Sequence, residues 1–290
     1  MDFHFYKYHA LGNDYLVVDP AKVNFVLDAE TIKRVCHRHY GVGSDGILYG
    51  PLTAPDAISL RIFNPDGSEA EKSGNGIRIF SRYLFDAGYV TTSPFTLTTP
   101  GGCVRVELLD AKASRLRVDM GTATFRSDLI PVNGKPREVI DEPIRVGDQQ
   151  FNVTCLSVGN PHCVLPLADI SPDLAKRLGP LIENHPLFPN RINVQFLQAI
   201  DNHNIRIEIW ERGAGYTLAS GSSSSAAAYA AHRLGFVGRQ VNVHMPGGII
   251  AIDITPDRHI HMTGPVTKVA EGFFADELKA VDDGRGSTPD

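Results

Sequence analysis

A pattern recurs along this chain at a constant spacing of 147 residues, and it constrains the fold more than any other feature. The run Ser73-Gly74-Asn75-Gly76 opens one apolar segment, and Ser220-Gly221-Ser222-Ser223 opens a second one. Other residues match at the same spacing: Asn13 with Asn160, Asn64 with Glu211, and Gly88 with Gly235. Several matches at one spacing, on the same strand–loop–helix pattern, predict two halves of common plan.

Hydrophobic periodicity predicts a mixture of strands and helices in each half. Alternating β-branched and aromatic residues between Gly, Pro or Asp predict strands at 3–8, 15–19, 58–64, 95–99, 104–109 and 116–119. In the second half they predict strands at 150–158, 163–165, 204–210, 241–244, 249–254 and 259–262. Helical spacing predicts helices at 31–39, 77–87, 173–184 and 222–234. The 27 glycines and 19 prolines indicate many turns rather than a helical bundle.

Charge and hydropathy exclude several classes of protein. The net charge of −5 argues against a protein that binds the nucleic-acid backbone. No apolar run approaches the roughly 18 residues of a membrane span, and the first ten residues lack the pattern of a signal peptide. The four cysteines, at 36, 103, 155 and 163, form no C-x-x-C pair. We therefore expect neither a metal site nor a disulfide framework, but free thiols in a reducing cytoplasm.

The two serines that open the repeated segments lie where a glycine-rich loop becomes a helix. Serine is a preferred N-cap residue, so capping alone would explain Ser73 and Ser220. A helix N-terminus also binds anions through its unpaired N–H groups and its macrodipole. Two such termini at a repeat spacing predict a cleft for a carboxylate. Neither a P-loop nor a dinucleotide-binding fingerprint is present.

Seven motifs along the chain resemble those of the diaminopimelate epimerase family, in the family's order. They are KYHALGND at 7–14, GVGSDG at 41–46, FNPDG at 63–67, GNGIR at 74–78, GNPHC at 159–163, RINV at 191–194 and ERGAGYTL at 211–218. The resemblance implies an α+β fold of two pseudo-symmetric domains, each a β-barrel-like or sandwich-like sheet around a central helix. It also implies a site between the domains, a homodimer, and an enzyme without pyridoxal phosphate or any other cofactor.

With the repeat, the resemblance predicts where the domains divide. The first domain would cover 1–121 together with about 265–276, and the second 122–264. A polar tail at 277–290 would follow, with its last ten residues frayed.

The family's reaction would interconvert LL- and meso-diaminopimelate, a precursor of lysine and peptidoglycan. One base removes the α-proton, and an acid on the opposite face returns one. Because no cofactor takes up the carbanion, fixed donors must hold the carboxylate and its developing charge. Two helix N-termini related by a pseudo-twofold repeat suit this task.

Carried over by position, the catalytic pair falls on Ser73 and Ser220, where the family has cysteines. A thiol has a pKa near 8.5 that a helix N-terminus lowers, whereas a serine hydroxyl needs a base of its own. Two serines should therefore greatly slow or abolish this reaction unless a neighbouring group activates them. His162 and Glu211 match residues that flank the reaction centre, and we expect His162 to titrate near neutrality.

The resemblance also assigns a set of substrate-binding residues. Arg212 would hold the distant amino-acid end, because arginine binds a carboxylate in bidentate fashion. The reacting carboxylate would bind the backbone amides of Gly74, Asn75, Gly221 and Ser222. The remaining positions are Asn13, Asn64, Asn160, Asn193 and Glu211.

Two further positions depart from the family pattern. Gly46 stands where some members have a glutamine that contacts substrate, and Tyr216 stands where a glutamate is usual. Three interpretations of the double serine remain open. The catalytic cysteines were replaced; or the protein is a divergent isomerase that acts on another amino acid with other bases; or it binds an amino acid without catalysis.

Overall fold

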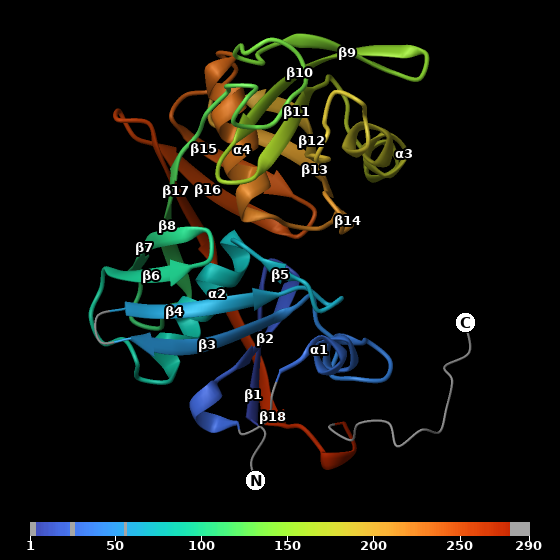
Figure 1. Ribbon diagram of the computed structural model, residues 1–290. Helices are drawn as coiled ribbons and strands as arrows, with labels where there is room; N and C mark the ends of the chain where they lie inside the picture. Colours follow the sequence, from blue (N-terminus) through green and yellow to red (C-terminus); the bar gives the residue numbers. More distant parts are fainter. Residues whose placement is uncertain (1–3, 24–26, 55–56, 279–290) are drawn as a thin grey trace, which may run out of the picture.

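The strands of both halves form one continuous hydrogen-bonded network around two central helices (Figure 1). The computed structural model describes residues 4–23, 27–54 and 57–278. Within these residues the chain has 18 strands and four α-helices. The predicted α+β class is thus present, with every strand linked into a single sheet.

The first half occupies the lower part of Figure 1. Its elements are β1 (His4–Ala10), β2 (Asn13–Val18), η1 (Pro20–Lys22), α1 (Ala29–Cys36), β3 (Ile47–Ala54), β4 (Ala57–Phe63), β5 (Glu69–Ala70), α2 (Gly74–Asp86), β6 (Phe95–Thr99), β7 (Gly102–Leu108) and β8 (Arg115–Thr122).

The second half lies above it. Its elements are β9 (Glu142–Val146), β10 (Gln149–Ser157), β11 (Pro161–Pro166), α3 (Pro172–Glu183), β12 (Asn193–Asp201), β13 (Asn204–Glu211), β14 (Gly215–Thr217), α4 (Gly221–Arg233), β15 (Gln240–Met245), β16 (Gly248–Ile254) and β17 (His259–Pro265). Then β18 (Thr267–Phe273) and η2 (Asp276–Leu278) follow.

Strand pairing repeats from one half to the other. The parallel pairs β2–β3 and β4–β6 have counterparts in β11–β12 and β13–β15, and the antiparallel pairs correspond in the same order. Helices α2 and α4 have 13 residues each, and both their first and last residues are 147 positions apart. The internal repeat read from the sequence is confirmed by these equivalent elements.

Two crossings join the halves. Strand β8 ends the series β1–β8 of the first half, and β17 ends the equivalent series β10–β17 of the second half. These two strands pair antiparallel. Strand β18 returns from the far end of the chain and pairs with β1, whereas β9 directly precedes β10 and pairs with it. The first half is therefore completed by a strand from the far end of the chain, and the second half by the strand directly before it.

The central helices are enclosed by the strands, and most of their residues are buried. In α2, the side chains of Ile77, Ile79, Phe80, Tyr83 and Leu84 are fully buried. Helix α4 instead buries small residues along its length, including the alanines at 226–228 and 230–231. A helix surrounded in this way is typical of a core element rather than a surface one. Each helix is followed by a glycine of positive φ, Gly88 (77°) or Gly235 (79°), the usual helix-ending conformation.

Element boundaries differ from the sequence prediction by a few residues. The helix predicted at 31–39 is α1, which starts earlier because Asp28 caps it by accepting from the Thr31 N–H. It ends at Cys36 because His37 is extended. The sequence prediction missed β3, β5, β9, β12, β14 and β18. Residues 277–278 of the predicted tail belong to η2, and 279–290 lie outside the described residues, as does residue 3.

Candidate active site

Helices α2 and α4 meet at their first residues, Gly74 and Gly221. A Cβ atom added to Gly74 would lie 3.2 Å from the Gly221 Cα, and one added to Gly221 would lie 3.1 Å from the Gly74 Cα. A larger residue at either position would push the helix starts apart. The repeat therefore brings two helix N-termini together, where their macrodipoles both favour an anion.

The residue before each helix is a serine in extended conformation that caps it. The Ser73 Oγ accepts from the Gly76 N–H at 3.0 Å, and the Ser220 Oγ accepts from the Ser223 N–H at 3.4 Å. The predicted capping role is thus present at both positions. The first-turn N–H groups of each helix have no intrahelical acceptor, so they can bind a carboxylate placed between the two serines.

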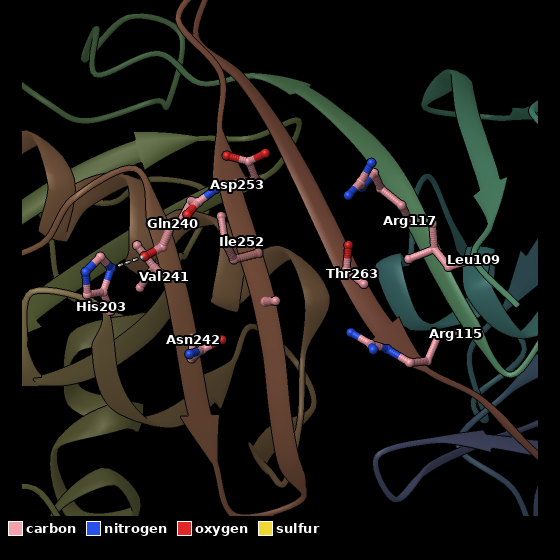
Figure 2. A pocket seen from close by; sticks show the side chains of 11 residues that line it. Leu109, Arg115, Arg117, His203, Gln240, Val241, Asn242, Ile252, Asp253 and Thr263 are labelled. Carbon is pink, nitrogen blue, oxygen red and sulfur yellow. Dashed lines mark hydrogen bonds between the residues drawn. The ribbon is translucent and has the colours of Figure 1, made fainter.

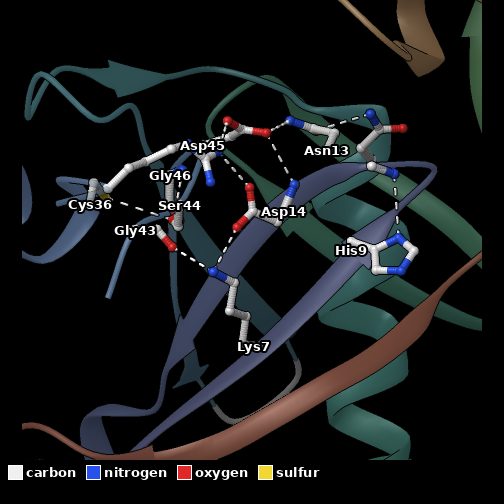
Figure 3. Close-up of polar contacts among 12 residues, drawn as sticks. Lys7, His9, Asn13, Asp14, Cys36, Gly43, Ser44, Asp45 and Gly46 are labelled. Carbon is white, nitrogen blue, oxygen red and sulfur yellow. Dashed lines mark hydrogen bonds and ion pairs between the residues drawn. The ribbon is translucent and has the colours of Figure 1, made fainter. Parts of the chain in front are cut away.

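The side chain of Asn75 ties the start of α2 to the other half. Its Nδ2 donates to the Ala219 carbonyl at 3.2 Å, directly before Ser220, and to the Asn13 Oδ1 at 3.0 Å. Asn13 in turn donates to the Asp45 Oδ2 at 2.9 Å (Figure 3). One chain of amide contacts thus fixes Asn13 relative to both helix starts.

Behind Asn13 lies a group of charged side chains on the first half (Figure 3). Arg38 bridges Asp45 and Asp14 with distances of 2.5 and 2.8 Å, and Lys7 lies 2.9 Å from Asp14. Burial opposes ionisation of Asp14, but hydrogen bonds from Arg38 and Lys7 outweigh it and hold the pKa of Asp14 below its usual range. These ion pairs fix the loop that carries Asp45.

Ser73 contacts the phenol of Tyr15, whose OH lies 3.3 Å from the Ser73 Oγ. Tyr15 belongs to β2 and is buried. Burial raises the pKa of Tyr15 to about 12; the hydrogen bond with Ser73 opposes the rise, and the charge of Glu211 adds to it. Because Glu211 belongs to the second half, groups from both halves influence the pKa of Tyr15.

Ser220 has a carboxyl partner instead. The carboxyl group is that of Glu211, the last residue of β13. Burial raises the pKa of Glu211 above its usual range, and the Ser220 side chain nearby opposes the rise. The Ser220 Oγ also lies 3.5 Å from the Ser222 Oγ. Ser222 in turn accepts from the Asn160 Nδ2 at 3.4 Å, so these side chains form one polar group around the α4 start.

His162 lies deeper in the second half, on β11. Its Nε2 contacts the Asn160 Oδ1 at 2.9 Å, and its side chain is fully buried. Burial lowers the pKa of His162 to about 3; the Gln195 side chain nearby offsets this in part, and the charge of Arg212 adds to the lowering. The expectation that His162 titrates near neutrality is therefore wrong, because the imidazole is fully buried and stays neutral.

Beneath the α2 start lies an arginine that the sequence analysis did not select. Arg78 is fully buried, and it donates to the Asn75 Oδ1 at 2.8 Å, the Gly74 carbonyl at 3.3 Å and the Met262 sulfur at 3.1 Å. Burial lowers the pKa of Arg78 to about 10, so it remains a cation at neutral pH. Within the described residues no carboxylate hydrogen-bonds to it.

The remaining predicted side chains are held by their own neighbours. Asn193 is buried, accepts from the Arg212 N–H at 3.0 Å and donates to the Pro161 carbonyl at 2.8 Å. Arg212 is exposed, and its guanidinium donates to the Asn190 carbonyl at 3.3 Å. The Asn64 Nδ2 donates to the Ser68 Oγ at 2.9 Å, within its own turn.

The two departures from the family pattern have structural explanations. A Cβ at Gly46 would lie 2.4 Å from the Phe63 carbonyl and 2.8 Å from the Tyr15 ring, so only glycine fits beside Tyr15. Tyr216 donates to the Glu208 Oε2 at 2.7 Å and packs with the second hydrophobic cluster. The Tyr216 hydroxyl therefore bonds to a residue outside the predicted site.

Two signals could have identified the missed residues. Tyr15 precedes His162 by 147 residues, so the repeat places it at the equivalent position of the first half. Arg78 lies four residues after Gly74, one helical turn beneath the α2 start. Among the described residues, no group of three or more His, Cys, Asp or Glu side chains is arranged to hold a metal ion.

A separate hollow lies where β8 and β17 join the two halves (Figure 2). Its volume is about 400 Å³, and Arg115, Arg117, His203, Asn242 and Asp253 are among its lining residues. It contains none of the predicted site residues.

Within the described part of the chain, no helix is long and apolar enough to cross a membrane.

A family model described as diaminopimelate epimerase matches residues 5–126 and 154–269. Diaminopimelate epimerase 2 of Nostoc sp. strain PCC 7120 is 56% identical over 279 residues, covering 96% of this chain and 98% of that protein. Diaminopimelate epimerase of Moorella thermoacetica is 40% identical over 275 residues, covering 93% and 99%.

Solved structures share the fold at low sequence identity. A probable proline racemase from Agrobacterium radiobacter K84 has a TM-score of 0.70 at 16% identity, covering 94% of this chain and 92% of that one. A PhzF-family phenazine biosynthesis protein of Bacillus anthracis has a TM-score of 0.66 at 17% identity, covering 95% and 99%. The predicted fold class is confirmed by these structures.

Proposed function

The chain belongs to the diaminopimelate epimerase family, and from that premise we propose that it interconverts LL- and meso-diaminopimelate by exchanging the α-proton at one centre. The observation that carries the proposal is the contact of two serine-capped helix starts through Gly74 and Gly221. That contact supplies an anion site with a hydroxyl group at each helix start.

The reacting carboxylate would bind the first-turn amides of Gly74, Asn75, Gly221 and Ser222. These donors are fixed by their helices before substrate arrives, so they need no reorganisation as charge develops on the α-carbon and carboxylate. The buried cation of Arg78 beneath Gly74 would favour the same negative charge. This chemistry lowers the barrier to proton removal without pyridoxal phosphate.

The distant amino-acid end would be held by the polar side chains around the site. Arg212 would turn from the Asn190 carbonyl to the distal carboxylate, and a guanidinium–carboxylate pair is a strong, oriented contact. Amide groups would select the amino group and reject substrates that lack it. These residues are Asn13, Asn64, Asn160 and Asn193.

The serines at 73 and 220 would stand on opposite faces of the α-carbon as acid and base. His162 would not exchange protons, because it stays neutral at physiological pH; it would orient Asn160 instead. Glu211 is the residue whose carboxylate can accept a proton from Ser220.

Exchange of the α-proton in heavy water tests the proposal. The purified protein is incubated with LL- or meso-diaminopimelate, and deuterium at Cα is followed by mass spectrometry alongside epimer composition. Incorporation with epimerisation supports the proposal. Incorporation into another amino acid but not diaminopimelate would favour a divergent isomerase, and binding without any exchange would favour a non-catalytic protein.

The family assignment extends the proposal to the protein's biological setting. We propose a cytoplasmic homodimer that serves lysine and peptidoglycan-precursor synthesis, with domains at 1–121 plus about 265–276 and at 122–264. Light scattering of the purified protein tests the dimer. Superposing residues 1–121 on 148–268 tests the domain division.

A further inference from the structure

We propose that Tyr15 is a catalytic proton donor of this site: its phenol re-protonates Ser73 as Ser73 delivers a proton to one face of the α-carbon. The inference rests on the proposed function and deepens it. It explains how serine can act where the family relies on thiols, because a second acidic group stands directly behind the hydroxyl.

The hydrogen bonds around Ser73 leave its own proton free. The Ser73 Oγ already accepts from the Gly76 N–H at 3.0 Å, and the Tyr15 OH lies 3.3 Å from the same atom. A phenol is a stronger acid than an alcohol, so of the two possible senses the phenol donates. With both contacts directed at its oxygen, Ser73 can point its hydrogen toward the substrate.

Ser220 is arranged in the opposite sense. The carboxyl group that influences it is that of Glu211, the last residue of β13, and an ionised carboxylate is only an acceptor. Ser220 therefore donates its proton toward Glu211 and turns an oxygen lone pair toward the α-hydrogen. One serine is supported as an acid by Tyr15, and the other is supported as a base by Glu211.

The equivalent positions of the repeat do not repeat these contacts. Tyr15 corresponds to His162, which contacts Asn160 rather than a serine. Glu211 corresponds to Asn64, which hydrogen-bonds within its own turn. Each half therefore supplies a titratable partner to its serine from a different equivalent position, so the duplicated site carries one donor and one acceptor.

The protons balance in one direction of turnover. Ser220 takes the α-proton as its own proton passes to Glu211, and Ser73 gives its proton to the opposite face as Tyr15 re-protonates it. Glu211 ends protonated and Tyr15 ends as phenolate, and one proton returned through solvent restores both. The reverse epimerisation uses the same steps backwards, with phenolate and carboxylic acid at the start.

The experiment compares Tyr15→Phe with the unmodified protein. We expect deuterium exchange into diaminopimelate to fall by roughly 100-fold, the usual loss on removing a positioned acid. The matched control is Tyr8→Phe. Tyr8 lies opposite Tyr15 in the β1–β2 pair and is buried, but its phenol donates to Asp86 at 2.9 Å. Loss of the Tyr8 hydroxyl should leave exchange unchanged. Thermal melting of both variants checks that they fold.

A second variant separates chemistry from packing. In a Ser73→Cys background the thiol is itself acidic enough to re-protonate the α-carbon, so adding Tyr15→Phe should reduce exchange by less than about threefold. A phenol that only packs against the helix start would cost the same factor in both backgrounds, which would overturn the proposal.

The remaining outcomes distinguish this inference from the proposed function. Exchange by the unmodified protein that Tyr15→Phe leaves intact refutes the role of Tyr15 alone. Exchange only after Ser73→Cys/Ser220→Cys also refutes it, while the diaminopimelate pocket stands. If neither the unmodified protein nor Ser73→Cys/Ser220→Cys exchanges the α-proton, the proposed function itself is refuted.

Discussion

At the start of α2 a serine hydroxyl contacts a phenol, while at the start of α4 the equivalent hydroxyl has a carboxyl group as its neighbour. The backbones of the two sites agree in cap, helix length and glycine contact. Duplication thus preserved the geometry that binds a carboxylate, while the side chains behind it differ. Inversion of a carbon centre needs that combination, because a proton is removed from one face and another is added to the opposite face.

The helix starts also differ in the residue one turn below. Arg78 donates to the Gly74 carbonyl, and its counterpart Ser225 donates to the Gly221 carbonyl at 2.9 Å. The same backbone contact is made by a cation in one half and a neutral hydroxyl in the other. A buried cation without a carboxylate partner costs several kcal/mol, so its presence beneath α2 concentrates positive potential on one side of the anion site.

The largest expected effect comes from replacing both hydroxyls by thiols. Ser73→Cys/Ser220→Cys should raise α-proton exchange by several orders of magnitude, because a thiol near a helix N-terminus is partly ionised at pH 7 and a hydroxyl is not. Deuterium incorporation across pH 6–9 measures this. Equal rates in the serine and cysteine proteins would show that proton transfer at these positions does not limit turnover.

Removing the carboxyl group from the α4 start should come next. Glu211→Gln should lower exchange by 10²- to 10⁴-fold, the loss typical of a general base. It should also abolish the rise of rate with pH that titration of this carboxyl, with its raised pKa, would cause. Glu208→Gln is the control, since Glu208 lies three residues away on the same strand and is buried against Tyr216. Equal losses in both variants would argue against a base at 211.

The glycine contact should distinguish the two halves by stability. An added Cβ at Gly221 meets the Met262 sulfur at 2.6 Å, whereas at Gly74 its tightest contact is 3.2 Å, to the Gly221 Cα. Gly221→Ala should therefore cost about 1–3 kcal/mol through overpacking, and Gly74→Ala should cost less. Urea unfolding of both variants gives the comparison, and a larger loss at Gly74 would contradict it.

The smallest effect is a dependence of stability on pH from the second half alone. The pKa of His162 is about 3 in the folded protein, against 6.5 when unfolded, so only the unfolded state gains a proton between these values. Stability should therefore be full above pH 6.5 and fall below it, by about 2 kcal/mol at pH 5. His162→Gln should remove that decline, whereas Tyr15→Phe at the equivalent position should not. If His162→Gln lost the same stability below pH 6.5, a group other than His162 would be responsible for the decline.

The sequence predicts the repeated helices well because their signals are local. Serine caps and terminal glycines delimit α2 and α4, and the constant spacing supports each from the other. Strand β3 was missed because Gly50 and Pro51 interrupt its pattern, and β18 because its exposed, polar residues resemble a loop. β18 is a strand because β1 pairs with it, a long-range contact that no local pattern carries.

Within the site, residue types were predictable but their environments were not. The positions of Ser73, Ser220 and Glu211 follow from motif and repeat. The low pKa of His162 depends on the complete burial of its imidazole. A local sequence pattern can predict a buried strand, but it does not show how deeply one side chain of that strand is buried. Tyr15 resembled an ordinary strand residue, since only the folded chain places its hydroxyl beside Ser73.

The pairing of β1 with β18 bears on how the chain is made. Lys7 leaves the ribosome first, yet its strand partner Ala270 is roughly 260 residues behind it. At 5–20 residues per second, β1 waits roughly 13 to 50 seconds with one edge unpaired. The second half meets no such delay, because β9 is synthesised just before β10. A nascent chain should therefore finish its later half first, and it closes the earlier half only when synthesis is nearly complete.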